Sequence, residues 1–489
     1  MSRPATRIVW GTLLAALLLS SSLGLRASGD AVQPERWDEN VRLPEAVDRN
    51  PDPHIVEIDL EARVADVELG SGEHVQAFTY NGGIPGPLIR VRKGDRLIVH
   101  FTNTLPQPTT VHWHGLRVPI AMDGVPIHSQ PEVPTGGSFT YDFVARDAGL
   151  FWYHPHVMSA AQVGFGLYGA LLVEDPDEQV GVRDELVIVL SDIATDGHGH
   201  FEPPDSGGPA GMVFGREGNH VLVNGRSHPV LKARSGAPQR WRIVNAAKSR
   251  YFNLELDGQI FTRIGGDGGL QEMPDKSDAL VLGPGERADL IVAPRRTKDG
   301  QPLVLRSLLF NRGYGSVEFR DIEDLIAIEM APLPEYTEPV IVATHRDIEP
   351  LQAAGATPVQ VDLTLAQKSD GAFEYGINGV PFSKAPIAAR VGETQLWTVK
   401  NTTKWSHPFH LHGFFFQVVD DTGNPVHPLA WKDTVNVPFE ATVRLLVRFD
   451  DRPGQWMYHC HILDHADGGL MGTVAVGVPA DLHPVNHVH

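Results

Sequence analysis

The chain alternates apolar and polar residues over short segments that are separated by turn-forming residues. In residues 56–62, with the sequence VEIDLEA, every second side chain is apolar. A period of two places the apolar side chains on one face of a strand, which is typical of a half-buried β-strand. The 49 glycines and 38 prolines favour many short strands over long helices. We therefore predict an all-β fold built from β-sandwiches.

A repeated spacing of turn residues divides the chain into three parts. In each part an Asn-Gly pair is followed by a single glycine and then, nine residues later, by an asparagine. The copies are Asn81-Gly82, Gly94 and Asn103; Asn224-Gly225, Gly236 and Asn245; and Asn378-Gly379, Gly392 and Asn401. Each copy predicts a turn, a strand, a glycine turn and a second strand. A chain of 489 residues has room for about three domains of about 150 residues, so we predict three β-sandwich domains.

Proline-containing, acidic joints at residues 174–177 and 331–335 mark the expected domain boundaries. We predict a first domain at 46–177, a second at 178–335 and a third at 336–489. Residues 1–29 contain Arg3 and Arg7, an apolar run at 8–25, and then Arg26 with small residues after it, which predicts a secretory signal peptide. If this segment is not cleaved, it would act as an N-terminal membrane anchor.

Export and charge limit the partners that we expect. An exported chain with one cysteine has no internal disulfide, so its thiol must be protected or used, and metal binding does both. The net charge of −19 argues against nucleic acid and against anionic membrane surfaces as partners. We expect a periplasmic or secreted monomer, which contacts a membrane only if the N-terminal segment stays uncleaved.

The only cysteine of the chain predicts a metal site. Cys460 stands between His459 and His461, and His465 follows five residues after it. In a strand, His459 and His461 share one face while Cys460 points to the other. One cysteine with two histidines is the blue-copper arrangement. Zinc, which prefers a closed set of four ligands, and an inert buried thiol are the alternatives, and the many further histidines disfavour both.

Four His-x-His pairs extend this pattern. The pairs are His112 and His114, His154 and His156, His410 and His412, and His459 and His461. Nine residues beyond the last asparagine of each repeat, the first and third copies have a histidine, whereas the second has Leu254. We therefore predict a cluster between the first and third domains, with no ligands there from the second. Eight imidazoles are too many for one ion and suit three coppers, while Cys460 with His407 and His465 would form a separate mononuclear site.

Taken in order, these four motifs resemble those of the multicopper oxidases, in particular the laccase-like, three-domain bacterial type. The resemblance implies three cupredoxin-like Greek-key β-sandwich domains and a copper-dependent oxidoreductase that reduces O2 to water with electrons from a small reducing substrate. It also implies four copper ions. By this resemblance the type 1 copper takes His407, Cys460 and His465, the type 2 copper takes His112 and His410, and the type 3 pair takes His114, His154, His156, His412, His459 and His461.

Two positions depart from the pattern of many bacterial relatives. Many bacterial relatives have a methionine ten residues after the cysteine as an axial copper ligand, whereas this chain has Leu470, followed by Met471. A leucine cannot coordinate, which raises the expected copper potential, and we expect Met471 to pack in the core. They also have an acid directly after the histidine equivalent to His465, whereas this chain has Ala466, so proton supply is expected to differ.

Two aspartates are candidates for supporting roles. Asp123 aligns with an acid that the family uses for proton delivery, so we predict a catalytic role, although Asp-Gly is also an ordinary turn pair. Asp433 could orient a ligand imidazole, and a turn at a strand end is the alternative.

The function that we predict is oxidation of phenols or aromatic amines. A cuprous or ferrous metal oxidase in copper tolerance is the alternative within the enzyme class, and a catalytically inactive copper-binding envelope scaffold is the alternative outside it. The sequence shows no methionine-rich insert, which disfavours the metal oxidase, and the complete ligand set disfavours the scaffold. The natural substrate stays open, because no motif defines the loops above the type 1 copper.

Overall fold

The computed structural model describes residues 32–70, 72–313, 321–339, 342, 345–383 and 385–479. The predicted signal peptide at residues 1–29 lies outside these described residues. Within the described residues, no helix combines the length and the apolar character needed to cross a membrane.

The first sandwich consists of two four-stranded sheets. One sheet contains, in spatial order, β2 (His74–Tyr80), β1 (Ile55–Glu68), β4 (Arg96–Asn103) and β6 (Ser138–Val144). The other contains β3 (Gly86–Arg92), β8 (Gly169–Glu174), β7 (Gly149–His154) and β5 (His112–His114). Buried aromatic residues, including Trp113 and Tyr141, fill the space between the sheets. The first two predicted histidine pairs therefore begin on the paired strands β5 and β7.

The second sandwich has a larger sheet and a smaller one. The six-stranded sheet contains β10 (His220–Val223), β9 (Glu185–Ile193), β12 (Gln239–Asn245), β17 (Arg287–Val292), β14 (Phe261–Gly266) and β15 (Gly269–Ser277). The five-stranded sheet contains β11 (Val230–Ala233), β19 (Glu323–Met330), β18 (Leu303–Leu308), β13 (Phe252–Leu256) and β16 (Ala279–Leu282). Trp241 and Phe252 are among the buried residues between them.

The third sandwich has two five-stranded sheets. One contains β21 (Phe373–Ile377), β20 (Thr357–Gln367), β23 (Thr394–Asn401), β27 (Thr442–Arg448) and β25 (Phe416–Val419). The other contains β22 (Ile387–Ala389), β29 (Met471–Val476), β28 (Gly454–Cys460), β24 (His407–Leu411) and β26 (Thr434–Val437). The antiparallel strands β24 and β28 bring the histidines of the third domain next to Cys460.

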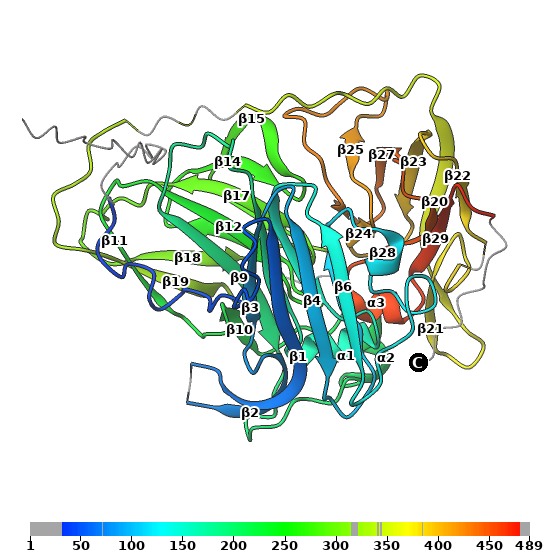
Figure 1. The fold of residues 1–489 in the computed structure, drawn as a ribbon, viewed down its shortest axis with the longest axis horizontal. Helices are drawn as coiled ribbons and strands as arrows, with labels where there is room; N and C mark the ends of the chain where they lie inside the picture. The colour runs from blue at the N-terminus through cyan, green and yellow to red at the C-terminus, as the bar shows by residue number, and fades with distance from the viewer. Residues whose placement is uncertain are drawn as a thin grey trace, which may run out of the picture. The chain divides into compact units, whose positions relative to one another are not determined.

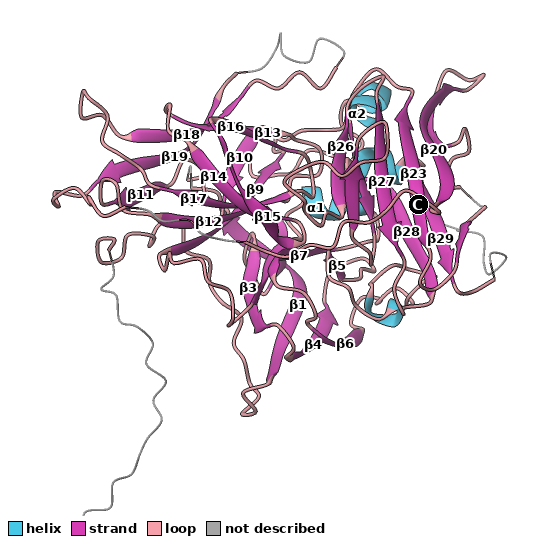
Figure 2. Ribbon diagram, turned by 90° about the horizontal axis from the view of Figure 1, so that it is seen from above, coloured by secondary structure: helices cyan, strands magenta, loops and turns pink. Residues whose placement is uncertain are grey.

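Strands account for nearly all of the regular structure, and the helices are short (Figure 2). They are η1 (Ile120–Met122), α1 (Ser159–Gly164), α2 (Gly208–Phe214) and α3 (Leu463–Asp467). Helix α3 directly follows β28 and contacts α1 of the first sandwich and α2 of the second (Figure 1). The segment after Cys460 therefore lies where all three parts of the chain meet.

The predicted repeat is confirmed by equivalent geometry in all three sandwiches. The asparagine that starts each copy has a positive φ, at 54° for Asn81, 51° for Asn224 and 52° for Asn378, as a tight turn requires. The asparagine that ends each copy donates its side-chain amide to at least two nearby backbone carbonyls. The same parallel pairing also recurs, as β1 with β4, β9 with β12 and β20 with β23. The all-β, three-sandwich prediction is therefore correct.

Candidate metal centres

The thiol of Cys460 and two imidazoles form one compact buried group. Nδ1 of His407 lies 3.3 Å from Sγ of Cys460, and Nδ1 of His465 lies 3.6 Å from it. The two Nδ1 atoms are 3.1 Å apart. All three side chains are fully buried. One sulfur and two nitrogens converging in this way are the donor set of a blue-copper site.

The outward sides of both imidazoles have partners. Nε2 of His465 donates to the carbonyl of Val213 at the end of α2, over 3.1 Å, so Nδ1 is the nitrogen with a free lone pair. Nε2 of His407 lies 2.8 Å from the hydroxyl of Thr403. The ring of Tyr375 stacks on His465 with centroids 4.3 Å apart. These contacts fix the direction in which each Nδ1 points.

Burial keeps the thiol of this group protonated until a cation is present. It raises the pKa of Cys460 well above its ordinary value and lowers the pKa of His407 to about 3. A bound metal ion reverses the preference of the thiol, because a coordinating thiol loses its proton. The backbone N–H of Ile462, 3.4 Å from Sγ, supports the resulting negative charge.

The other eight histidines that the sequence predicts as ligands lie on the opposite side of β28. Three groups of nitrogens lie within ligand distance of one another: His112, His114 and His410; His114, His154 and His461; and His156, His412 and His459. Each group combines the first and third sandwiches, as the sequence predicts. Among the described residues, none of these groups includes a residue of the second sandwich.

Hydrogen bonds select the nitrogen that each of these imidazoles offers. Nδ1 of His112 donates to the carbonyl of Asp123 at 2.7 Å, and Nδ1 of His410 donates to the carbonyl of Asp433 at 2.9 Å. Carbonyls likewise accept from Nδ1 of His154 and His459. Since a neutral imidazole has one N–H, these bonds leave Nε2 as the possible metal ligand.

The imidazole nitrogens that make no hydrogen bond show whether these residues fit a metal ion. Within the part of the chain that the structure describes, several buried imidazole nitrogens of the cluster make no hydrogen bond. They are Nε2 of His112, His154 and His410, Nδ1 of His114, and both nitrogens of His461. Buried polar atoms rarely lack a partner, and here they converge on one another. The donor set therefore fits metal ions that prefer imidazole.

The electrostatics of the cluster favour neutral imidazoles, which are the form that binds metals. Burial, reinforced by neighbouring imidazoles, lowers the pKa of these side chains below the ordinary histidine value; the residues are His114, His154, His156, His459 and His461. The pKa of His412 falls to about 3 for the same reasons. Metal binding at neutral pH then needs no loss of protons from these groups.

Asp123 lies against the histidine cluster, and its predicted catalytic role stays a prediction. Its Oδ2 lies 2.9 Å from Nδ1 of His412, and its Oδ1 lies 3.4 Å from Nδ1 of His112. Burial alone would raise the pKa of Asp123, but His412 and His112 lower it well below its usual range. The carboxylate is therefore charged and contacts imidazoles of two different groups.

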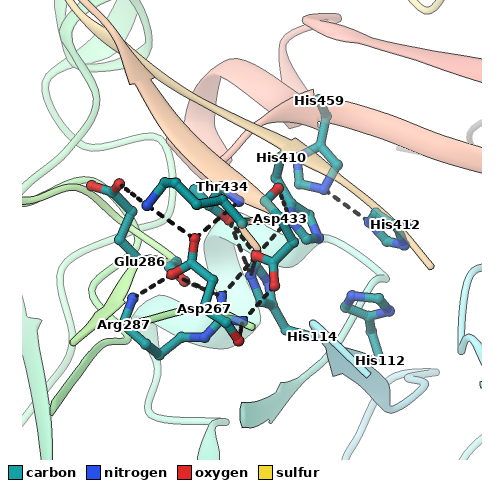
Figure 3. A network of polar contacts seen from close by, with 12 residues as sticks. His112, His114, Asp267, Glu286, Arg287, His410, His412, Asp433, Thr434 and His459 are labelled. Atoms are coloured by element: carbon teal, nitrogen blue, oxygen red, sulfur yellow. Dashed lines mark hydrogen bonds and ion pairs between the residues drawn. The ribbon is translucent and has the colours of Figure 1, made fainter. Parts of the chain in front are cut away.

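Asp433 occupies the equivalent place on the other side of the cluster. It precedes β26, and its Oδ1 accepts from Nε2 of His114 at 3.1 Å. That bond leaves Nδ1 of His114 free. Figure 3 shows Asp433 between these imidazoles and Arg287 of the second sandwich, which forms a two-pronged ion pair with the carboxylate. The contact with His114 agrees with the orienting role, and Asp433 stands in a bend directly before β26 begins.

Leu470 and Met471, which follow the thiol group in the chain, lie in different buried clusters. Leu470 is fully buried in the same apolar cluster as Cys460. Met471 belongs to a different buried cluster, with Val125, Met457 and Ala466. This placement agrees with a core-packing role for Met471, while the axial role of the Leu470 position stays a prediction.

A large cavity adjoins α3, the helix that carries His465. Its volume is about 1140 Å³. Asp464, Asp467 and Gly468 form part of its wall, and three methionines, Met158, Met212 and Met471, also line it. No sequence motif pointed to this cavity, because its walls come from loops and short helices of all three sandwiches.

Comparisons with known proteins agree with the geometry. Residues 61–178, 184–305 and 354–480 each match a multicopper oxidase family. Multicopper oxidase MmcO of Mycobacterium tuberculosis is 33% identical over 84% of this chain and 85% of its own length. A laccase of Bacillus subtilis is 27% identical over 82% and 90%. The multicopper oxidase of Campylobacter jejuni, described as a metallo-oxidase, superposes with a TM-score of 0.79 at 29% identity, covering 89% of this chain and 94% of that one.

Proposed function

We propose, from the premise that this chain belongs to the multicopper oxidase family, that it is a laccase-type oxidase of phenols and aromatic amines. Family membership and the three cupredoxin-like sandwiches make the chain a copper-binding oxidoreductase that reduces O2. The division of eleven buried donors into one thiol-containing group and a separate histidine cluster supports the oxidase, and the cavity beside α3 supports the choice of an aromatic donor.

The residues that would hold four copper ions follow from these groups. We assign the type 1 copper to His407, Cys460 and His465, the type 2 copper to His112 and His410, and the type 3 pair to His114, His154 and His461 on one side and His156, His412 and His459 on the other. When bound, copper supplies the one-electron redox chemistry and the affinity for O2 that protein side chains lack.

The chain itself provides the connection between the two centres. Cys460 is bonded through the backbone to His459 and His461, which belong to two different groups of the cluster. The thiol group and the cluster are thus joined by a covalent path of a few atoms. Both lie in fully buried surroundings, where water does not compete for the donor atoms.

The cavity beside α3 is the place that we propose for the reducing substrate. It is large enough for an aromatic ring system, and its apolar surface includes Met158 and Met212. Asp467 adds a carboxyl group at its wall, which suits phenolic hydroxyls and amino groups, whereas the carboxylate of Asp464 is paired with Arg216. A substrate held there lies next to the helix that carries His465.

The same cavity supports a metal oxidase as the second candidate. Three methionine side chains and two aspartates line it, and thioethers are ligands that cuprous ion prefers. The Campylobacter relative, described as a metallo-oxidase, adds weight to this alternative. The absence of a methionine-rich insert from the sequence still favours the aromatic substrate.

Copper analysis and oxygen uptake test both proposals. We expect the copper-loaded protein to hold about four copper ions, to show an intense blue absorption band and to consume O2 with a phenolic donor. Cuprous ion, supplied in the same assay at matched concentrations, distinguishes the candidates, because the higher kcat/KM identifies the preferred donor. A colourless protein that holds at most one copper ion after loading would refute the oxidase and favour the scaffold.

A further inference from the structure

The second sandwich contributes no ligand to the described metal groups, yet one of its side chains lies at the edge of the cluster. Arg287 begins β17 and is fully buried. A buried guanidinium is costly unless all of its donors are satisfied. The burial of this charge therefore indicates that Arg287 holds other groups in place.

All five N–H groups of Arg287 have acceptors, and these come from all three sandwiches. Nε donates to the carbonyl of Leu150 at 3.2 Å, in the strand that ends at His154. Nη1 and Nη2 donate to the carbonyls of Gly285 and Asp267, each at 2.9 Å. The remaining two N–H groups grip Asp433, with Nη1 2.7 Å from Oδ1 and Nη2 bonded to Oδ2. The guanidinium thus has a fixed position relative to the strands that carry the ligands.

Asp433 connects the fixed guanidinium to two imidazoles. Its Oδ1 accepts from Nε2 of His114, and its backbone carbonyl accepts from Nδ1 of His410. The hydroxyl of Thr434 also donates to Oδ1 at 2.8 Å. The rings of His114 and His410 are stacked, with centroids 3.8 Å apart. A rotation of the Asp433 carboxylate would therefore change the orientation of His114 and disturb the stacked His410.

Further buried charges surround this pair and keep it from relaxing. Asp267 accepts from the backbone N–H of Arg287 at 2.9 Å, and its other oxygen lies 3.3 Å from Nζ of Lys432. Lys432 also lies 3.3 Å from Glu286. Figure 3 shows the network of Arg287, Asp267 and Glu286 on the side of Asp433 away from His412 and His459. Each ion in the network has at least one partner of opposite charge.

We propose that Arg287 is a positioning residue of the copper cluster: by fixing the Asp433 carboxylate, it presents Nδ1 of His114 and Nε2 of His410 to the metal. This inference rests on the proposed copper function. It gives the second sandwich a defined role, as the part of the molecule that orients ligands supplied by the other two. Arg287 itself touches no ligand atom in this role and acts through Asp433.

The test compares Arg287→Lys with the wild type after copper loading. Lysine keeps the charge but cannot form the two-pronged pair. We expect the affinity of the cluster for copper to fall about 10- to 100-fold, at the type 3 position held by His114 and at the type 2 position held by His410, which is the usual effect of losing such a supporting contact. The type 2 signal in electron paramagnetic resonance should also change its hyperfine splitting, while the blue type 1 band persists and reports a folded third sandwich.

Arg240→Lys is the matched control. Arg240 is a buried arginine of the same sheet, and it forms a two-pronged pair with Asp289. Its replacement should leave the type 2 signal and affinity unchanged. If Arg287→Lys also retains both, the proposal is wrong. A wild-type protein that binds no copper would instead refute the proposed function.

A second comparison decides the matter if Arg287→Lys does not fold. The double variant Arg287→Met/Asp433→Asn leaves no buried unpaired charge at this position, and it is compared with Asp433→Asn alone. If Arg287 acts through Asp433, the two proteins should have the same type 2 affinity and hyperfine splitting, because effects within one pathway are not additive. A further loss in the double variant would overturn the proposal.

Discussion

The carbonyl oxygen of Val213 accepts a hydrogen bond from Nε2 of His465. Helix α2 of the second sandwich thereby covers the outward edge of an imidazole that belongs to the third. The bond fixes the tautomer of His465 and also prevents a substrate from reaching Nε2 while α2 stays in place. This cover agrees with our proposal that a reducing substrate approaches beside α3, where the cavity lies.

Replacing Tyr375 with phenylalanine should weaken the packing of α2 against His465 without removing the copper. The Tyr375 hydroxyl donates to Val213 at 2.5 Å and accepts from Nε1 of Trp405 at 2.6 Å. Tyr375→Phe removes both bonds, and we expect it to cost about 1–3 kcal/mol of stability. The blue band should persist, because the ring that stacks on His465 remains. Denaturant unfolding and visible absorption of the copper-loaded protein measure the two effects.

Tyr168→Phe is the control for this substitution. The Tyr168 hydroxyl is buried and donates to Ser191 at 2.7 Å, so its loss should also lower stability and leave the band unchanged. Bleaching in Tyr375→Phe alone would show that the hydroxyl is needed for copper binding and would contradict the prediction.

Leu470→Met should lower the potential of the type 1 copper. Leu470 shares its buried cluster with Cys460, and a thioether there could coordinate where leucine cannot. The exchange nearly conserves volume and should cost less than about 1.5 kcal/mol. Redox titration of the blue band measures the shift. Met471→Leu is the matched control and should leave the potential unchanged, since Met471 packs with Val125 and Met457. An unchanged potential in Leu470→Met would end the axial assignment.

Much of the architecture follows from local sequence signals. The Asn-Gly turns and the asparagine nine residues after each glycine predict three equivalent sandwiches, because each turn requires a particular backbone geometry. The His-x-His pairs predict which imidazoles share a face, because side chains alternate along a strand. These signals lie within a few residues of one another, and the structure preserves them.

The supporting contacts could not be predicted in the same way. Arg287 and Asp433 are 146 residues apart, and only the packing of the sandwiches brings them together. Val213 acts through its backbone carbonyl, so its side chain carries no signal. Arg287 gives one signal in the sequence, because it is a charged residue next to segment 288–293, which is apolar except for Asp289. A charge next to a core strand is a reason to look for a buried partner.

Asp123→Asn should slow oxygen reduction and keep the blue colour. Asp123 contacts His412 and His112, which belong to the histidine cluster. If it supplies protons there, its loss should reduce the rate of O2 reduction about 10²- to 10⁴-fold. Stopped-flow measurements separate the two half-reactions: anaerobic bleaching by a phenolic donor should be unchanged, whereas recovery of the colour with O2 should be slow. Recovery at the wild-type rate would leave Asp123 without a catalytic role.

The copper-free protein should lose stability as the pH falls below neutral. The pKa values of His407 and His412 are about 3 in the folded chain, compared with about 6.5 in an unfolded one. Between these values the unfolded chain binds more protons, so the stabilising effect is complete above about pH 6.5 and is lost progressively below it. Each of these two imidazoles then costs about 1.4 kcal/mol for each pH unit.

Thermal unfolding of the copper-free protein between pH 8 and pH 4 measures this dependence. The buried carboxylates Asp123 and Asp433, whose pKa values are lowered, add their effect only below about pH 4. A melting temperature that is constant from pH 7 to pH 5 would therefore contradict the role assigned to the histidines. Copper should raise the melting temperature at neutral pH, because it binds the folded chain.

Gly285→Ala should damage the cluster from the side of the second sandwich. Gly285 has a φ of +86°, and a Cβ there would lie 3.0 Å from the ring of His461 and 3.1 Å from Cε1 of His114. Alanine in this conformation costs about 1–2 kcal/mol, and the contact would also push two ligand rings. Gly258→Ala separates the two effects, because Gly258 has a φ of +69° with nothing within 4 Å of its Cβ position. Copper counting should show loss from the cluster only in Gly285→Ala, with the blue band present in both variants. Equal copper content in the two proteins would show that the cluster tolerates movement of these rings, and that the second sandwich does not hold them in place.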